Sequence, residues 1–184
     1  MGKPYEFGIL VGRFQMIHAG HVDMIRKARE LCSRVGILVG SSQESGTAKN
    51  PFTYETRRDM LRLLFPDPDV SICPLPDIGV GNNARWGEYV LRFILEHYGE
   101  MPELLISGKE ARRVDWFDGT AGASIAELYI PKTIDISATR MRENLIADRY
   151  EEWKEYTDSK LWSMYPELRK TVLASMTNTE TMSI

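Results

Sequence analysis

The sequence has few of the residues that build disulfide scaffolds, metal centres or membrane spans. Its 184 residues include only two cysteines and three histidines. The cysteines, Cys32 and Cys73, form no CxxC pair and fall within predicted core elements. We therefore expect both thiols to be reduced and buried, and the protein to be cytoplasmic. No apolar run approaches the length of a membrane span and no signal-peptide core is evident, so no membrane partner is expected.

An excess of charge of one sign is also lacking. The formal net charge is −3, with 27% charged and 43% apolar residues. This balance is that of an ordinary soluble protein, and it argues against a general nucleic-acid binder. We find no internal repeat. No GxGxxG motif follows the first predicted strand, which disfavours a redox dinucleotide-binding domain.

Short apolar runs alternate with helical patterns along the chain. Five runs are predicted as buried strands: 6–12, 35–40, 70–75, 104–108 and 127–131. The alternation predicts an α/β fold, a Rossmann-like doubly wound parallel sheet of about five strands with helices on both faces and a C-terminal helical segment. We expect a main domain over residues 1–146 and a helical extension, 147–184, packed on it.

A chemically suggestive stretch follows each predicted strand. These stretches are 12–21, 41–58, 76–86, 107–117 and 135–142. In a doubly wound parallel sheet the ligand binds beyond the carboxyl ends of the strands, near the topological switch point. We therefore expect all five stretches to share one face of the molecule.

The first of these stretches places two histidines at the start of a helix. It reads Gly12-Arg13-Phe14-Gln15-Met16-Ile17-His18-Ala19-Gly20-His21. His18 and His21 can point at one anion, and the helix N-terminus adds free N–H groups and partial positive charge. Gly20 would let the backbone approach a ligand closely. An HxxH pair alone also fits a two-histidine metal site or a helix cap, but Arg13 in the same loop favours phosphate binding.

The last stretch carries hydroxyl groups and arginines at another helix start. It reads Ile136-Ser137-Ala138-Thr139-Arg140-Met141-Arg142. A Ser/Thr pair here is usually only a cap. Two arginines in the first turn are unusual, because the helix dipole disfavours cations at that end. Hydroxyls, backbone N–H groups and an arginine fork together suit a triphosphate.

These two stretches resemble the HxGH and ISSTxxR motifs of the nucleotidylyltransferase superfamily. Three further blocks resemble the archaeal-type nicotinamide mononucleotide adenylyltransferases and their Nudix-fused bacterial relatives: Gly40-Ser41-Ser42-Gln43, Asn50-Pro51-Phe52-Thr53 with Arg57, and Pro74-Leu75-Pro76-Asp77-Ile78 with Trp86. The resemblance covers roughly residues 5–146. It departs at Met16-Ile17, where the family commonly has Pro-Phe, and at Ala138, where it has Ser or Gly. Residues 109–122 match no pattern of the family.

The resemblance implies in-line transfer of AMP from ATP to nicotinamide mononucleotide, without a covalent intermediate. It implies catalytic roles for His18, His21 and Arg142, with Mg²⁺ carried by ATP rather than by protein ligands. The partners implied are small molecules, ATP and a mononucleotide, with no nucleic acid. The residues implied to bind ATP or phosphate are Gly12, Arg13, Phe14, Gln15, Gly20, Ser137 and Thr139, and those implied to bind the acceptor nucleotide are Asn50, Arg57, Asp77 and Trp86.

Several alternatives stay open from the sequence. Arg57 also fits a solvated surface position, and Trp86 also fits a core aromatic at helical spacing. The chain also fits a cytidylyl- or adenylyltransferase for another phosphorylated acceptor. A non-catalytic nucleotide-binding regulatory module is disfavoured by the retained histidines and the late arginine. The sequence does not decide whether the chain forms a homo-oligomer.

Overall fold

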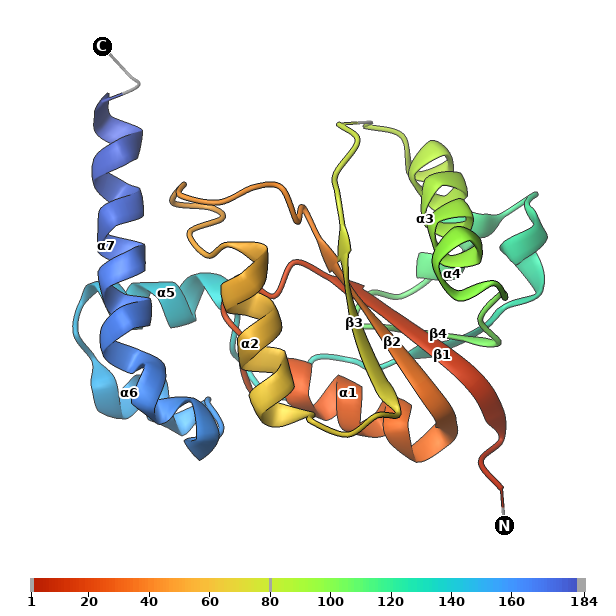
Figure 1. The fold of residues 1–184 in the computed structure, drawn as a ribbon, viewed down its shortest axis with the longest axis horizontal. Helices are drawn as coiled ribbons and strands as arrows, with labels where there is room; N and C mark the ends of the chain where they lie inside the picture. Colours follow the sequence, from red (N-terminus) through yellow and green to blue (C-terminus); the bar gives the residue numbers. More distant parts are fainter. Residues whose placement is uncertain (1, 80, 182–184) are drawn as a thin grey trace.

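The fold was analysed in a computed structural model, which describes residues 2–79 and 81–181 (Figure 1). Helices and strands alternate through the first two thirds of the chain, and helices alone follow. In chain order the elements are β1 (Tyr5–Gly12), α1 (Ala19–Leu31), β2 (Cys32–Gly40), α2 (Tyr54–Leu64), β3 (Val70–Leu75), α3 (Asn83–Tyr98), β4 (Leu104–Ser107), α4 (Arg112–Phe117), η1 (Ala121–Ser124), β5 (Ala126–Tyr129), α5 (Ala138–Ile146), α6 (Tyr150–Glu155), η2 (Ser159–Met164) and α7 (Tyr165–Thr181).

The five strands form one sheet in the order β3-β2-β1-β4-β5. Each neighbouring pair is parallel. The chain moves outward from β1 to β3 and then returns to place β4 on the other side of β1, so the order reverses between β1 and β4. This is the switch point at which ligands bind in such sheets. The predicted α/β class and doubly wound parallel sheet are confirmed.

Two hydrophobic cores cover the two faces of the sheet. The first core contains Val22 and Ile25 of α1 with Met60 and Leu61 of α2. The second core joins α3 and α4 to the opposite face, where Figure 1 shows these two helices side by side. Successive residues of β1 enter different cores, since alternate side chains of a strand point to opposite faces. Burial on both faces explains why the strands read as unbroken apolar runs.

Helix α4 lies close against α3 because α3 has a glycine at the contact. A Cβ atom on Gly87 would collide with the backbone carbonyl of Trp116, whose side chain is buried in the second core. Helix α3 itself begins at the cap Asn82, whose side chain accepts from the N–H of Arg85 at 3.0 Å. Close backbone packing therefore fixes the position of α4 relative to the sheet.

The helices after α5 extend the first core rather than building a separate one. Trp153, Leu161, Leu168 and Val172 are buried in the same cluster as α1 and α2. Figure 1 shows α7 along the side of the molecule that carries α2 and α5. Among residues 2–79 and 81–181, no helix combines the length and apolar character needed to cross a membrane.

Two local features differ from the sequence prediction. The second strand was predicted over residues 35–40, whereas β2 begins at Cys32, which pairs with Tyr5 of β1. Residues 109–122, which match no pattern of the family, contain the short helix α4 and the first two residues of η1. In both places tertiary packing overrides a weak local pattern, since Trp116 and Phe117 anchor α4 in the second core.

Candidate active site

The two histidines of the first motif stack on each other at the N-terminus of α1. His18 is the N-cap residue and makes no side-chain capping bond. The ring centroids of His18 and His21 lie 3.9 Å apart. A Cβ atom on Gly20 would approach the His18 ring to 3.2 Å, so a glycine at this position leaves room for that ring. The ring of Phe14 packs on His21 from the other side, with centroids 5.1 Å apart.

The loop between β1 and α1 is held in an unusual backbone conformation. Phe14 and Met16 have φ values of 52° and 136°, in the region that residues with side chains rarely adopt. Both side chains are buried, as is Ile17. Such conformations persist where the surrounding structure determines them, and they cluster at functional sites. The departure at Met16-Ile17 thus lies in the first core, outside the lining of the cavity described below.

Both imidazoles are neutral at pH 7. Burial and then the positive charge of Lys132 lower the pKa of His18 to about 4. Burial and then the charge of His18 hold the pKa of His21 well below its usual range. The Nδ1 atom of each ring is buried and has no hydrogen-bond partner among the described residues. Two neutral imidazoles side by side can donate hydrogen bonds to an anion without repelling each other.

The stability of the protein is expected to fall between pH 7 and pH 5. His18 titrates near 6.5 when unfolded and near 4 when folded, so the unfolded chain takes up the proton first. The contribution of His18 to the free energy of unfolding is fully present above the unfolded pKa. It is lost as the pH falls toward the folded pKa, and the loss at pH 5 is about 2 kcal/mol. Urea denaturation at both pH values measures it. His18→Gln should reduce the difference and leave the part that His21 contributes, and an unchanged difference would contradict this origin.

The late motif forms the start of α5 beside the same loop. Ser137 caps the helix, accepting from the N–H of Arg140 at 3.2 Å. Arg142 donates to the backbone carbonyl of Gln15 at 2.8 Å and to Oγ1 of Thr139 at 3.2 Å. Burial and then the charge of Arg13 lower the pKa of Arg142. The late motif is thereby tied directly to the loop of the histidines.

Only one of the two arginines of the late motif faces that loop. Arg140 instead donates to the carbonyl of Asp135 at 3.1 Å, and its guanidinium lies 5.8 Å from the ring centroid of Tyr156. Tyr156 belongs to the C-terminal helical segment, and its carbonyl accepts from the N–H of Ala19 at 2.8 Å. The segment after α5 therefore secures the first residue of α1.

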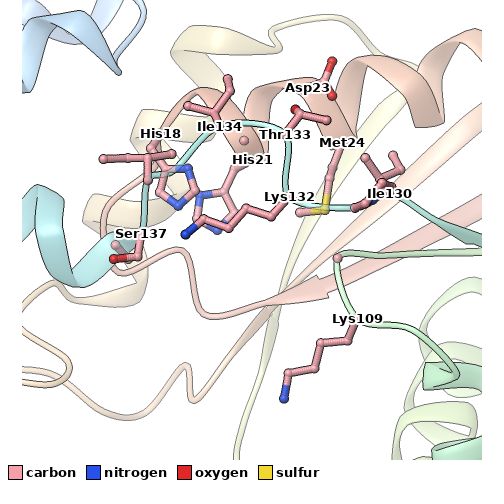
Figure 2. Close-up of a pocket in the computed structure, with 15 residues that line it drawn as sticks. His18, His21, Asp23, Met24, Lys109, Ile130, Lys132, Thr133, Ile134 and Ser137 are labelled. Atoms are coloured by element: carbon pink, nitrogen blue, oxygen red, sulfur yellow. The ribbon is translucent and has the colours of Figure 1, made fainter.

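One cavity of about 490 Å³ receives both helix N-termini (Figure 2). His18, Gly20 and His21 line it from α1, and Ser137 and Ala138 line it from α5. Within the described part of the chain, the N–H groups of Gly20, Ala138 and Thr139 have no acceptor. Free N–H groups at a helix N-terminus form an anion site. Two such termini on one cavity suit a ligand with several negative charges.

The cavity also contains residues that the sequence analysis did not single out. Figure 2 shows Lys132 beside the histidines and Lys109 on the opposite side. The apolar wall is formed by Met24, Ile130 and Ile134. Lys109 and Lys132 each follow the carboxyl end of a strand, β4 or β5. Both lysines therefore lie at the same edge of the sheet as the motifs, but neither belongs to a recognised motif.

Gln15 holds two loops together rather than facing the cavity. Its side-chain amide accepts from the N–H of Phe52 and donates to the carbonyl of Phe52, both at 3.0 Å. The side chain is buried, and both of its polar groups are satisfied by protein. Gly12 and Phe14 are likewise packed together, since a Cβ on Gly12 would lie 3.1 Å from the Phe14 ring. These residues shape the loop from within.

Arg57, expected to bind the acceptor nucleotide, is fully buried among backbone carbonyls. Its guanidinium donates to the carbonyls of Thr53, Arg13, Gly40 and Ser41 at 2.8–3.2 Å. Burial lowers its pKa. The alternative of a solvated surface arginine is wrong, because the residue is 0% exposed. Arg57 is a positioning residue that gathers three chain segments at the carboxyl ends of β1 and β2.

The other predicted acceptor residues have mixed outcomes. Asn50 is buried and accepts from Arg13 at 3.3 Å, while its amide donates to Glu44, so it orients Arg13. Asp77 is exposed and bonds to the β2–α2 loop through Gln43. Trp86 packs in an aromatic group with Tyr89 and Trp116 beside the second core, which favours the core-aromatic alternative.

Comparisons with known proteins agree with this geometry. The Cytidylyltransferase-like family model matches residues 9–144. A nicotinamide-nucleotide adenylyltransferase of Aeropyrum pernix is 30% identical over 169 residues, covering 89% of this chain and 88% of that protein. The enzyme of that name from Saccharolobus solfataricus is 44% identical over 88 residues, covering 45% of this chain. That match spans 50% of the length of the Saccharolobus protein.

Solved structures share the fold at lower sequence identity. A bifunctional NMN adenylyltransferase/ADP ribose pyrophosphatase from Francisella tularensis superposes with a TM-score of 0.72 at 20% identity, covering 96% of this chain and 54% of that one. A NadR protein in complex with NAD and AMP-PNP gives a TM-score of 0.60 at 22% identity, covering 85% of this chain and 46% of that one. Family match, curated relatives and fold agree, and the chain belongs to the Cytidylyltransferase-like family of nucleotidyltransferases.

Proposed function

We propose that the chain is a nicotinamide-nucleotide adenylyltransferase, which joins ATP and nicotinamide mononucleotide to give NAD and pyrophosphate. The observation that carries the proposal is the cavity onto which the N-termini of α1 and α5 both open, with His18, His21 and Lys132 around it. A triphosphate is the ligand whose charge and length suit this arrangement. The names of the archaeal relatives support the choice of acceptor.

In this reaction an oxygen of the acceptor phosphate attacks the α-phosphorus of ATP. The bond from that phosphorus to the bridging oxygen breaks, and pyrophosphate leaves with the electron pair. The enzyme has to align the two substrates and stabilise charge. We assign His18 and His21 to the α-phosphate as neutral donors, through Nε2 because Nδ1 is buried. Arg142 and the first turn of α5 then hold the β- and γ-phosphates, and Arg13 binds phosphate beside them.

Mg²⁺ enters this proposal with ATP. Among the residues that the structure describes, no group of three or more His, Cys, Asp or Glu side chains is placed to hold a metal ion. Mg²⁺ prefers phosphate oxygens and water and uses few protein ligands. The apolar wall of Met24, Ile130 and Ile134 is left for the adenine base. We place the reaction in residues 1–146, with 147–184 as a packed extension, in a cytoplasmic protein whose two buried cysteines are free.

A pyrophosphate-release assay tests the proposal. ATP and CTP are each combined with nicotinamide mononucleotide, nicotinate mononucleotide or phosphopantetheine, in the presence of Mg²⁺. We expect release with ATP and a pyridine mononucleotide, and none with phosphopantetheine. Release with CTP in place of ATP would replace the proposed nucleotidyl donor, and release with phosphopantetheine alone would replace the proposed acceptor. No release with any pair would favour a nucleotide-binding module without catalysis.

The same assay measures the contribution of the histidines. His18→Ala is expected to lower kcat by about 10²–10³-fold, the usual effect of removing one donor to a transition-state oxygen. A melting curve of the variant checks that it is folded. Unchanged pyrophosphate release by folded His18→Ala would show that the histidine pair is outside the reacting centre.

A further inference from the structure

A second, smaller cavity adjoins the first at the switch point of the sheet. Its volume is about 240 Å³, and it shares Gly108 and Lys109 with the first cavity. Its apolar floor is formed at the ends of β1 and β4 by Val11, Leu105 and Ile106. The size suits a single ring with one substituent rather than a whole nucleotide. A ligand that fills both cavities would pass Lys109 on its way from one to the other.

Arg112 of α4 lines this second cavity without a charged partner. Its guanidinium carbon lies 4.5 Å from the ring centroid of Trp116, which holds the side chain in place. Across residues 2–79 and 81–181, no hydrogen bond or ion pair from the Arg112 side chain is found. Burial lowers its pKa, and the charges of Asp115 and Glu127 act on it only from beyond ion-pair distance. A half-buried guanidinium in this state is costly unless an anion joins it.

The position of Arg112 is fixed by the surrounding helices. Trp116 is buried, and α4 is held against α3 by the close contact at Gly87. Arg113, the next residue, turns away and donates to the carbonyl of Ala123 at 2.7 Å. The cation in the cavity is therefore preorganised, and a matching anion would bind without rearrangement.

The charge of a pyridine mononucleotide distinguishes its two common forms. The ring is a pyridinium cation, so a guanidinium beside a carboxamide form meets a net positive charge. A ring carboxylate cancels that charge and accepts two parallel N–H bonds from arginine. The acceptor phosphate has to reach the α-phosphate of ATP beside His18, in the first cavity. The second cavity is then left for the ring end of the acceptor.

We propose that Arg112 binds a carboxylate on the acceptor ring, so that this chain prefers nicotinate mononucleotide over nicotinamide mononucleotide. The inference rests on the adenylyltransferase reaction of the proposed function, and it shifts the preferred pyridine mononucleotide from the carboxamide to the carboxylate form. Lys109, at the junction of the cavities, adds positive charge along the path of the same acceptor.

The test compares kcat/KM for the two mononucleotides, with ATP saturating, in the wild type and in Arg112→Ala, Arg112→Lys and Arg112→Gln. We expect the wild type to favour the carboxylate form by roughly ten- to hundredfold, the value of a charge-assisted hydrogen bond. Arg112→Ala and Arg112→Gln should lose most of this preference, and Arg112→Lys should keep part of it. Arg92→Ala removes the same charge from an exposed site on α3 and should leave the preference unchanged.

Two kinetic results would overturn the inference. One is a wild type that turns over the carboxamide form as well or better. The other is an Arg112→Ala variant that loses turnover of both acceptors equally, which would indicate a phosphate contact or a structural role. Calorimetric binding of each mononucleotide without ATP separates this inference from the proposed function. Arg112-dependent preference in binding without any turnover would refute the adenylyltransferase and retain the carboxylate site, and binding without preference would refute the site.

Discussion

Replacing Arg142 with alanine is expected to lower kcat/KM for ATP by about 10²–10³-fold, as for other donors aimed at transition-state charge. The guanidinium is held by the carbonyl of Gln15 and by Thr139, which leaves donors for a phosphate. Arg142→Lys keeps the charge but loses the fork, so it should recover activity only in part. Pyrophosphate release at varied ATP concentration measures the effect.

The stability of the same variant separates a ligand contact from a structural role. Loss of the bond to Gln15 should lower the free energy of unfolding by about 1 kcal/mol. Arg140→Ala is the matched control, because Arg140 lies on the same helix turn but faces Tyr156. We expect the control to keep wild-type kcat/KM. Parallel losses of stability and activity in Arg142→Ala would make Arg142 a structural arginine.

Replacing Arg57 with methionine is expected to lower the free energy of unfolding by about 3–5 kcal/mol, because several buried carbonyls lose a charged donor at a cost of roughly 1–3 kcal/mol each. The guanidinium satisfies buried carbonyls of Arg13, Gly40 and Ser41. Methionine fills part of the volume but offers no donor, so the carbonyls of Arg13 and Gly40 lose this partner and that of Ser41 keeps only the bond from the N–H of Glu44. Guanidinium chloride denaturation at pH 7 measures the change.

The neighbouring arginine provides the control. Arg58 is partly exposed, forms an ion pair with the exposed Asp59 and lies 5.8 Å from the ring centroid of Tyr54, so Arg58→Met should change stability by about 0.5 kcal/mol or less. A stable Arg57→Met protein with lost turnover would instead support the contact with the acceptor nucleotide that the sequence suggested.

The sheet was predictable because its strands are buried on both faces. Ile9 and Leu10 are adjacent in β1 yet enter opposite cores, so the strand reads as one apolar run. The strand alternation and the loops at the carboxyl ends then fixed where a ligand could bind. The start of β2 at Cys32 was not predictable, because a helix face and a buried strand both accept cysteine at that point.

The candidate site was predictable where residues act through local spacing. The start of α1 holds His18, Gly20 and His21, and the start of α5 holds Ser137 and Arg142. Their positions relative to one another follow from helical spacing, which can be recognised in the sequence. Residues that act through long-range burial were not predictable. Arg57 and Asn50 have ordinary surface residue types, and only the packed loops show that they bind other protein groups. Arg112 lay in a segment without a pattern, and its cavity is formed by residues far apart in the sequence, from β1, β4 and α4.

The two hydrogen bonds between the Gln15 side chain and the backbone of Phe52 restrict which amino acid can occupy residue 15. The position needs a donor and an acceptor side by side, at the distance from Cα that glutamine provides. Glutamate has the reach without the donor, and asparagine has both groups but is one methylene short. Among the twenty residues glutamine alone meets all three demands. Any substitution at residue 15 is therefore expected to lose at least one of the two hydrogen bonds to Phe52.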